Sequence, residues 1–407
     1  MWFAMQPISQ TERDIVAGID QQRMLERTQH WAAINSGTGN LAGLARMAEA
    51  LSETFATLPG KVTLRDPAPV TVVDAEGREV EKPHGQHLVC SVRPEAERRF
   101  LLTGHMDTVF PSDHPFQDLQ WLDEETLNGP GTADMKGGIA VIAEALMALE
   151  TSDAAANIGY DVMINADEET GSLSSAKLID ELARGKFAAL TYEPSALPDG
   201  TLAHARGGSG NYAVTFTGKS AHAGRNPQDG RNAIVAAADC AVQLKAMQHR
   251  DLPINPAKIE GGAANNVVPD HAVLRFNIRP RTTRAADEFS GNLQNLIADL
   301  ARQHDLDIAL HGGISRPPKP VDAKAQKLFD LVRDTGAALG QTIGWQSTGG
   351  VCDGNNIAAN HVPVVDTMGV RGGRIHSPDE FMIAPSLTER AQLSAIVLHR
   401  LASGDML

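Results

Sequence analysis

The chain has 407 residues, of which 42% are hydrophobic, and its net charge is −14. This length favours two domains, and the acidic charge argues against nucleic acid or an anionic membrane as the main partner. No run of about 18 apolar residues is present, and the start of the chain lacks the basic and apolar regions of a signal peptide. The three cysteines, Cys90, Cys240 and Cys352, are too few and too scattered for a disulfide framework. We therefore expect a cytoplasmic protein that binds neither nucleic acid nor membrane.

The first half of the chain passes from helical patterns to strands and then alternates between the two. In chain order, the expected elements are helices at 13–35 and 40–58, strands at 61–65, 70–74, 87–93 and 99–104, a helix at 135–150, a strand at 157–165, a helix at 174–185 and a strand at 187–193. Strands that alternate with helices indicate an α/β domain with a mainly parallel, helix-covered sheet.

The pattern changes near Arg206. The expected elements there are a strand at 210–218, a helix at 230–248, strands at 257–262 and 271–280, a helix at 285–303 and a strand at 307–313. Their β-α-β-β-α-β order is that of a complete ferredoxin-like domain. A helix at 325–339 then resumes the first pattern. The sequence predicts a small domain inserted into a larger one, with segments 1–206, 207–316 and 317–407.

Three adjacent acidic residues, Asp167, Glu168 and Glu169, follow the expected strand at 157–165. Neighbouring carboxylates repel each other and resist burial, so a solvated loop is their ordinary interpretation. In parallel sheets, however, ligands gather beyond the carboxyl ends of the strands. A cation at that edge would remove the repulsion.

Other residues able to bind a metal lie after strands or in glycine-rich turns. Asp107 is two residues beyond His105 and can hold the second imidazole nitrogen, which fixes the tautomer that binds metal. Asp134, before a helix, has an alternative role as a helix N-cap. Taken together, two imidazoles and three carboxylates at one sheet edge suit two divalent cations. The five are His105, Asp134, Glu169, Glu193 and His376.

These motifs resemble the co-catalytic di-zinc metallopeptidase superfamily, which includes glutamate carboxypeptidases, succinyl-diaminopimelate desuccinylase, acetylornithine deacetylase, aminoacylase and peptidase T. The resemblance runs from about Leu101 to His376 and is nearest to the bacterial glutamate carboxypeptidases. It rests on motifs in the expected order, namely GHMDTV, GTADMKGG, ADEETGS, YEP, GKSAHAG, NVVP and RIHS. It implies a zinc-peptidase-like α/β fold whose inserted domain forms a homodimer.

The resemblance implies two zinc ions per subunit, for which cobalt or manganese could substitute. Asp134 would bridge the two ions. His105 and Glu193 would hold one of them, and Glu169 and His376 would hold the other.

The same resemblance implies a cis peptide bond between Asp134 and Met135. Adjacent residues of an extended segment point in different directions, so Glu169 can reach a metal while Glu168 faces a water activated by it. Glu168 is then the expected general base, which passes a proton from that water to the leaving amine. Asp167 is expected to serve as scaffold.

By the same resemblance, the inserted domain supplies further site residues. His222 would reach across the dimer interface to polarise the substrate carbonyl, and Asn266 would join it near the oxyanion. Arg316 would grip a substrate carboxylate, for which a guanidinium fork is suited. Arg279 either contributes to substrate binding or forms a salt bridge within the domain. Cys352 has no base of its own and is expected to pack in the core.

The sequence thus predicts a zinc-dependent hydrolase that cleaves an amide bond next to a free carboxylate, in N-acyl or peptidyl amino acids. The alternative is an N-acyl amino acid deacylase of the acetylornithine deacetylase or succinyl-diaminopimelate desuccinylase type, which shares every metal residue. A silent binding protein on this fold would lack Glu168 or a ligand, and none is missing. Arg371 and Arg374, near His376, could extend an anion-binding rim.

Overall fold

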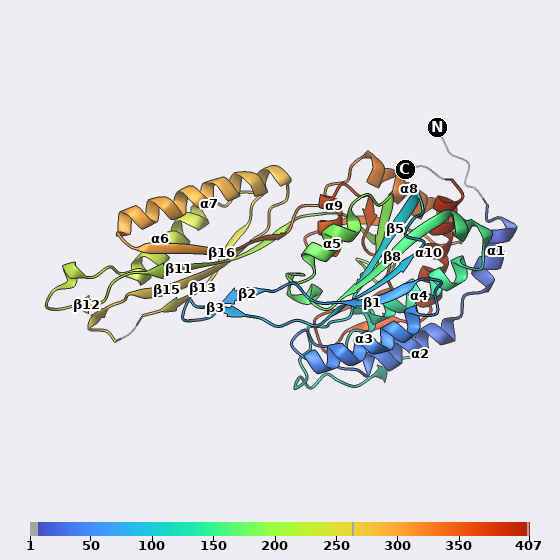
Figure 1. Ribbon diagram of the computed structural model, residues 1–407, viewed down its shortest axis with the longest axis horizontal. Helices are drawn as coiled ribbons and strands as arrows, with labels where there is room; N and C mark the ends of the chain where they lie inside the picture. The colour runs from blue at the N-terminus through green and yellow to red at the C-terminus, as the bar shows by residue number, and fades with distance from the viewer. Residues whose placement is uncertain (1–6, 263, 405–406) are drawn as a thin grey trace.

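The computed structural model describes residues 7–262, 264–404 and 407. Residues 1–6, on which the prediction of no signal peptide partly rests, lie outside this range. A larger unit with a helix-covered sheet and a smaller unit with its own sheet lie end to end along the long axis (Figure 1). Among the described residues, no helix combines the length and apolarity needed to cross a membrane.

The larger unit is built on a six-stranded sheet. In spatial order its strands are β1 (Lys61–Arg65), β4 (His87–Val92), β8 (Ile158–Asn165), β5 (Arg98–His105), β9 (Ala188–Thr191) and β18 (Val364–Val365). The strands from β8 to β18 are parallel, and only the pairings of β4 with its two neighbours are antiparallel. The predicted mainly parallel sheet is confirmed. Parallel pairing sets His105 opposite Asn165, so the segments that follow β5 and β8 leave from the same edge.

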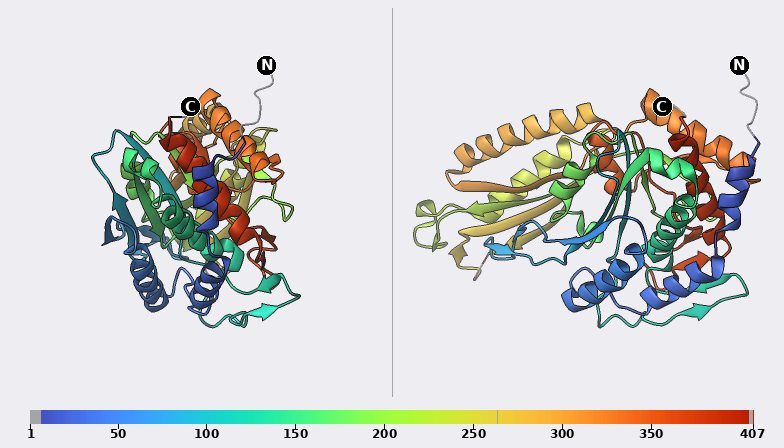
Figure 2. Two further views of the ribbon diagram at one scale, coloured as in Figure 1. Left: turned by 90° about the vertical axis from the view of Figure 1, so that its right-hand side faces the viewer. Right: turned by 45° about the vertical axis from the view of Figure 1, so that its right-hand side comes forward.

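Helices cover both faces of this sheet (Figures 1 and 2). They are α1 (Gln10–Ala17), α2 (Gln21–Ala32), α3 (Leu41–Phe55), α4 (Gly137–Leu149), α5 (Ala176–Ala183), α8 (Ala323–Ala338), α9 (Asp353–Ala359) and α10 (Ser386–Ala402). Successive strand residues face opposite ways, so Leu102 packs into the core with α3, α4 and α10, and Leu101 into the core with α5 and α9. Because α4 lies beneath α10, it is buried almost all round, as its apolar sequence requires.

The predicted helix at 13–35 is wrong in one respect, since it is broken into α1 and α2. Gly18 ends α1, and Asp20 caps α2 by accepting a hydrogen bond from the Arg23 N–H (3.1 Å). Glycine and an N-capping aspartate stop one helix and start the next. Several short strands were also not predicted, because two to five residues carry little periodicity. They include β6 (Gln120–Trp121), β7 (Thr126–Asn128), β19 (Gly372–Gly373) and β20 (Phe381–Ile383), which form one small sheet, and the pair β10 (Leu202–Arg206) and β17 (Trp345–Thr348).

The smaller unit has the predicted β-α-β-β-α-β order. Its elements are β11 (Ser209–Thr217), α6 (Ala233–Ala246), β13 (Ile254–Gly261), β15 (His271–Ile278), α7 (Thr283–His304) and β16 (Asp307–Arg316). The antiparallel sheet runs β13-β15-β11-β16. Residues such as Phe216, Leu274 and Phe289 form a core separate from those of the larger unit. At the far end, β12 (Ala221–His222) pairs with β14 (Val267–Val268).

A hairpin of the larger unit reaches across to the smaller sheet (Figure 1). Its strands are β2 (Thr71–Val73) and β3 (Glu79–Glu81). Arg275 of β15 donates hydrogen bonds to the main-chain oxygens of Val73 (2.8 Å) and Asp74 (2.9 Å). Val73 also packs against Ala213 and Val273. The hairpin therefore links the two units in addition to the two chain crossings near Arg206 and Arg316.

Candidate metal centre

The five predicted ligands meet at the edge where the parallel strands end. His105 is the last residue of β5, Glu193 follows β9, and Glu169 lies in the turn after β8. Asp134 precedes α4, and His376 follows β19. Their potential ligand atoms form two groups that share Asp134, and within each group these atoms lie within 4.8 Å of one another. One group is His105, Asp134 and Glu193, and the other is Asp134, Glu169 and His376.

Asp134 turns one carboxylate oxygen toward each imidazole. Its Oδ1 is 3.1 Å from His105 Nε2, and its Oδ2 is 3.3 Å from His376 Nε2. On the outer sides, His376 Nε2 is 3.1 Å from Glu169 Oε2, and His105 Nε2 is 3.8 Å from Glu193 Oε2. A carboxylate placed between two imidazole–carboxylate pairs has the geometry of a bridging ligand.

The electrostatics of these residues fit a cation in each group. Burial raises the pKa of Glu193, and burial together with the charge of Asp134 raises that of Glu169 to about 7. Burial alone would lower the pKa of His105, but hydrogen bonds with Asp107 and Asp134 raise it well above its ordinary value. A cage that stabilises positive charge in this way, with one nitrogen and two carboxylate donors on each side, fits divalent metal ions.

The loop that carries Asp134 is held from behind by Glu380, a residue that sequence reasoning missed. Glu380 is buried, and its Oε1 accepts hydrogen bonds from the N–H groups of Ala133 and Asp134 (both 3.0 Å). Its Oε2 accepts one from the Gly131 N–H (3.1 Å). Only its position, four residues after His376, could have signalled this role. The predicted cis peptide bond after Asp134 is present.

Asp107 joins two of the ligand-bearing segments. Its carboxylate accepts hydrogen bonds from the N–H groups of Glu168 and Glu169, both at 3.2 Å, and from Thr38 Oγ1 at 2.7 Å. The imidazole of His105 is oriented by the same residue, but His105 Nδ1 is nearer to the Asp107 main-chain oxygen (3.0 Å) than to its Oδ1 (3.4 Å). Thr38 was not foreseen because it comes from the turn before α3, far away in sequence.

Comparison with known proteins identifies the chain. The sequence model of Peptidase family M20/M25/M40 matches residues 101–400. The chain belongs to this family. It is 27% identical to carboxypeptidase G2 of Pseudomonas sp. (strain RS-16) over 393 residues, which cover 95% of this chain and 91% of the relative. It is 28% identical to succinyl-diaminopimelate desuccinylase of Maricaulis maris (strain MCS10) over 317 residues, which cover 71% of this chain and 77% of the relative.

The fold comparison agrees with the sequence comparison. The crystal structure of aminopeptidase PepT from Bacillus cereus ATCC 10987 superposes with a TM-score of 0.70 at 21% identity, and the match covers 94% of this chain and 99% of that chain. The family membership confirms the predicted relationship to glutamate carboxypeptidases and desuccinylases. This M20 peptidase is therefore a metal-dependent hydrolase.

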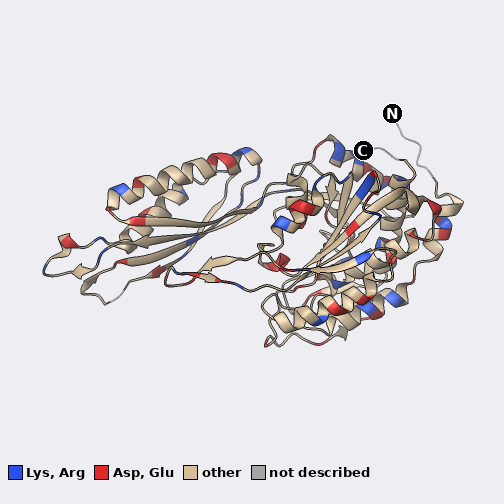
Figure 3. Ribbon diagram, in the orientation of Figure 1, with Lys and Arg blue, Asp and Glu red and all other residues tan. Residues whose placement is uncertain are grey.

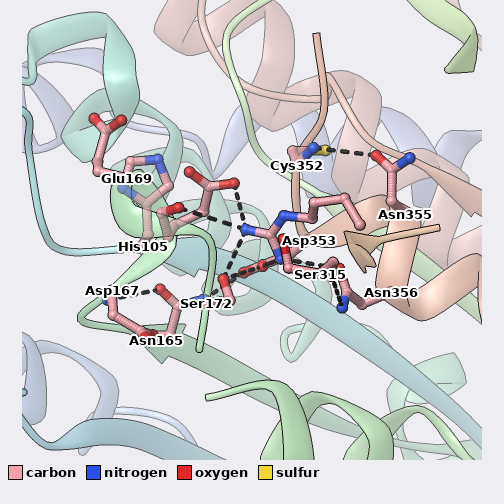
Figure 4. A network of polar contacts seen from close by, with 12 residues as sticks. His105, Asn165, Asp167, Glu169, Ser172, Ser315, Cys352, Asp353, Asn355 and Asn356 are labelled. Atoms are coloured by element: carbon pink, nitrogen blue, oxygen red, sulfur yellow. Dashed lines mark hydrogen bonds and ion pairs between the residues drawn. The ribbon is translucent and has the colours of Figure 1, made fainter. Parts of the chain in front are cut away.

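In the M20 peptidase, Arg316 contacts Glu168 inside the protein. The contact belongs to the polar network that includes Ser172 and Asp353 (Figure 4). Its side chain is 2% exposed, and Nη2 donates to Glu168 Oε1 (2.8 Å) and to Ser172 Oγ (2.7 Å). Its Nη1 donates to Asp353 Oδ1 (2.7 Å) and to Asn356 Oδ1 (2.9 Å). Burial raises the pKa of Glu168 well above its ordinary value, and the charge of Arg316 opposes that shift. The guanidinium predicted to hold substrate is thus already paired with two carboxylates of the protein.

A cavity of about 560 Å³ is lined by four of the five candidate ligands, all but His105, and by residues of both units. Arg279, just after β15, lines it and is exposed. Its Nε donates to Asn277 Oδ1 (2.9 Å), and it has no ion pair with any acidic residue that the structure describes. Cys352 lines the same cavity, but burial raises its thiol pKa well above the ordinary value, so the thiol stays protonated. Its predicted packing role agrees with this state.

The four remaining predicted residues lie elsewhere. His222 and Asn266 are neighbours at the far end of the smaller unit, near β12 and β14, where Ala223 N–H donates to the Asn266 main-chain oxygen (2.9 Å). Both are exposed, and the fold of one chain does not bring them to the metal ligands. Arg371 pairs with Glu389 and Arg374 with Asp379, each within 3.3 Å.

The helices of both units carry charged residues of both signs. Acidic and basic positions are interspersed over the helices of both units (Figure 3).

Proposed function

We propose that this M20 peptidase hydrolyses an amide bond next to a free carboxylate, in N-acyl or peptidyl amino acids. The observation that carries the proposal is the exposed Arg279 in the cavity that is also lined by residues of both ligand groups. A guanidinium without an acidic protein partner is available for a substrate carboxylate. The relationship to carboxypeptidase G2 supports the same class of substrate.

The donor set is suited to two zinc ions, with cobalt or manganese as substitutes. Asp134 would bridge them, His105 and Glu193 would complete one site, and Glu169 and His376 the other. Bound divalent ions supply Lewis-acid polarisation of the scissile carbonyl and lower the pKa of water.

Glu168 is the proposed general base. Its carboxylate lines the cavity beside the ligand groups, where it can accept a proton from the attacking water and deliver it to the leaving amine. Asp107 supports this role, because its carboxylate accepts hydrogen bonds from the main-chain N–H groups of Glu168 and Glu169. These bonds hold the backbone from which the two glutamate side chains project. Arg316 holds Glu168 Oε1 in place from the opposite side and is the second candidate for contact with the substrate carboxylate.

His222 and Asn266 are proposed to act on the active site of a second copy. They are exposed at the end of the segment 207–316, which we propose as the dimerisation domain between catalytic segments 1–206 and 317–407. A homodimer can bring such a distant histidine to the partner's substrate carbonyl.

A cytoplasmic location is proposed as well, since all three cysteines are free thiols.

The first experiment is a panel of N-acyl amino acids and dipeptides, each as the free acid and as the C-terminal amide, assayed with zinc, cobalt or manganese. Hydrolysis of the acids alone supports the proposal, and equal hydrolysis of acids and amides contradicts it. The desuccinylase relatives make N-succinyl substrates part of the panel, because a preference for them would favour the deacylase alternative.

The division of labour between the two adjacent glutamates is tested in parallel. Glu168→Ala should retain its metal content but lose activity by roughly 10²-fold or more, because a general base contributes about that factor. Glu169→Ala should also lose metal. Equal metal content in the two variants would contradict the assignment.

The proposed action of His222 in trans is tested by mixing two inactive variants, His222→Ala and Glu168→Ala, under conditions of subunit exchange. Random pairing makes about half of the dimers mixed, and one of the two sites in each mixed dimer is then intact. About a quarter of the sites should therefore recover activity. A mixture that stays inactive, although tagged subunits prove exchange, would place His222 in its own chain's site or outside catalysis.

A further inference from the structure

A second cavity, of about 810 Å³, adjoins the cavity that contains the metal ligands. Residues 194–196, directly after Glu193, line both cavities, and so does Ile375, directly before His376. The two spaces therefore meet at the loops that carry one ligand of each group. A substrate whose scissile bond lies over the ligands can extend into both.

The two cavities differ in chemical character. The first is strongly charged, since it contains Glu168 and three of the acidic candidate ligands together with three arginines. Arg206 and Arg316 are paired with carboxylates of the protein, whereas Arg279 has no ion pair among the described residues. The second combines a few uncharged polar residues, such as Gln120 and Asn128, with apolar side chains from β6–β7, β20 and the two loops, including Leu122, Pro194, Pro198, Ile375, Pro378 and Phe381.

The charged groups of the second cavity leave it without net charge. They are Arg374 and Asp379, which pair with each other at 3.3 Å and are 68% and 70% exposed. A carboxylate therefore meets no unpaired cation among the residues that line this cavity, whereas an apolar group can lie on the walls.

The apolar walls of this cavity are open to solvent. Leu122 is 55% exposed and Ile375 is 39% exposed, although both are large and apolar. Exposed apolar side chains that gather in a concave site next to catalytic groups are typical of a ligand-binding surface.

We propose that the second cavity binds the acyl side of the substrate and selects a large apolar or aromatic acyl group. This inference rests on the proposed function, which places the substrate carboxylate at the arginines of the first cavity. The part of the substrate on the other side of the scissile amide then enters the space that lacks free cations. Its size is within the range of about 300–1,000 Å³ found for small-molecule sites.

The proposal is tested with one amino acid that bears acetyl, butyryl or benzoyl groups on its nitrogen. We expect kcat/KM to rise with acyl size, and the benzoyl compound to exceed the acetyl compound by at least about 10-fold, since even one methylene in an apolar pocket is worth about 10- to 200-fold. If no N-acyl amino acid is hydrolysed, the proposed function fails. If all three are hydrolysed with equal kcat/KM, the proposed function stands and the acyl site is refuted.

A variant assigns the preference to this cavity. Leu122→Ser should reduce the benzoyl-to-acetyl ratio several-fold, because it removes apolar contact area from the wall. Leu122 is mostly exposed, so its replacement leaves the core intact. Leu64→Ser is the matched control, since Leu64 on β1 is 40% exposed and does not line either cavity. An unchanged ratio in Leu122→Ser, or an equal decrease in both variants, would overturn the assignment.

Discussion

Replacement of Arg316 by methionine removes the cation that lies between two buried carboxylates. The side chains of Arg316 and Asp353 are 2% and 3% exposed and that of Glu168 is 12% exposed, so solvent screens the charges little. Loss of one partner from a buried ion pair costs about 3–5 kcal/mol. Asp353 keeps a hydrogen bond from Ser172 Oγ (2.6 Å), which moderates the loss. We therefore expect the free energy of unfolding to fall by about 3 kcal/mol.

Urea unfolding of the metal-free protein measures this change in a double-mutant cycle with Asp353→Asn. If the two residues interact as the geometry indicates, the coupling free energy should be at least about 1 kcal/mol. Arg333→Met is the control, because Arg333 pairs with Asp330 at the surface and should contribute less than about 1 kcal/mol. A loss below about 1 kcal/mol in Arg316→Met, or strict additivity with Asp353→Asn, would refute the reasoning.

The same variant separates two roles of Arg316 in catalysis. A contact between its guanidinium and a substrate carboxylate is worth about 1.5–3 kcal/mol, so KM should rise tenfold or more for free-acid substrates and little for their amides. A residue that acts only by holding Glu168 would instead lower kcat for acids and amides alike. The loss of kcat/KM for the free acid, divided by the loss of kcat/KM for the matching amide, decides between these roles.

Asp134→Asn should lose metal from both ligand groups, because Asp134 is shared, and metal analysis that still finds two tight ions would contradict the bridging role. Glu380→Gln replaces one acceptor oxygen by a donor and should weaken metal binding at Asp134 about tenfold, as measured by chelator competition. The control is Asp379→Asn at an exposed neighbouring position, which should leave metal binding unchanged. His87 accepts a hydrogen bond from the Ala166 N–H, and burial lowers the pKa of its imidazole. Below about pH 6.5 the unfolded chain therefore binds more protons at this residue than the folded protein does, so the free energy of unfolding falls as pH falls. His87→Gln should reduce that decrease between about pH 7.5 and 5.5 in urea unfolding, and an unchanged pH dependence would exclude this origin.

The sequence by itself determined the main architecture and brought out the set of candidate metal ligands. Helix and strand periodicities are local properties, so the long elements of both units were predictable from their own residues. The candidate ligands were predictable because His105 ends a buried strand, Glu169 and Glu193 follow two others, and the ends of parallel strands meet at one edge. The break between the first two helices was missed even though Gly18 and Asp20 mark it, because the apolar pattern continues across it.

Only the tertiary structure decided what surrounds those ligands. Arg316 comes from the last residue of β16 and contacts Glu168 and Asp353, which are separated from it by 148 and 37 positions in sequence. Glu380 is 246 positions from Asp134, and no local pattern relates the two. The distance of His222 from the metal ligands likewise follows from the length of the smaller sheet. Periodicity reports which side of an element is buried, but the identity of the partner on that side is set by packing between distant segments.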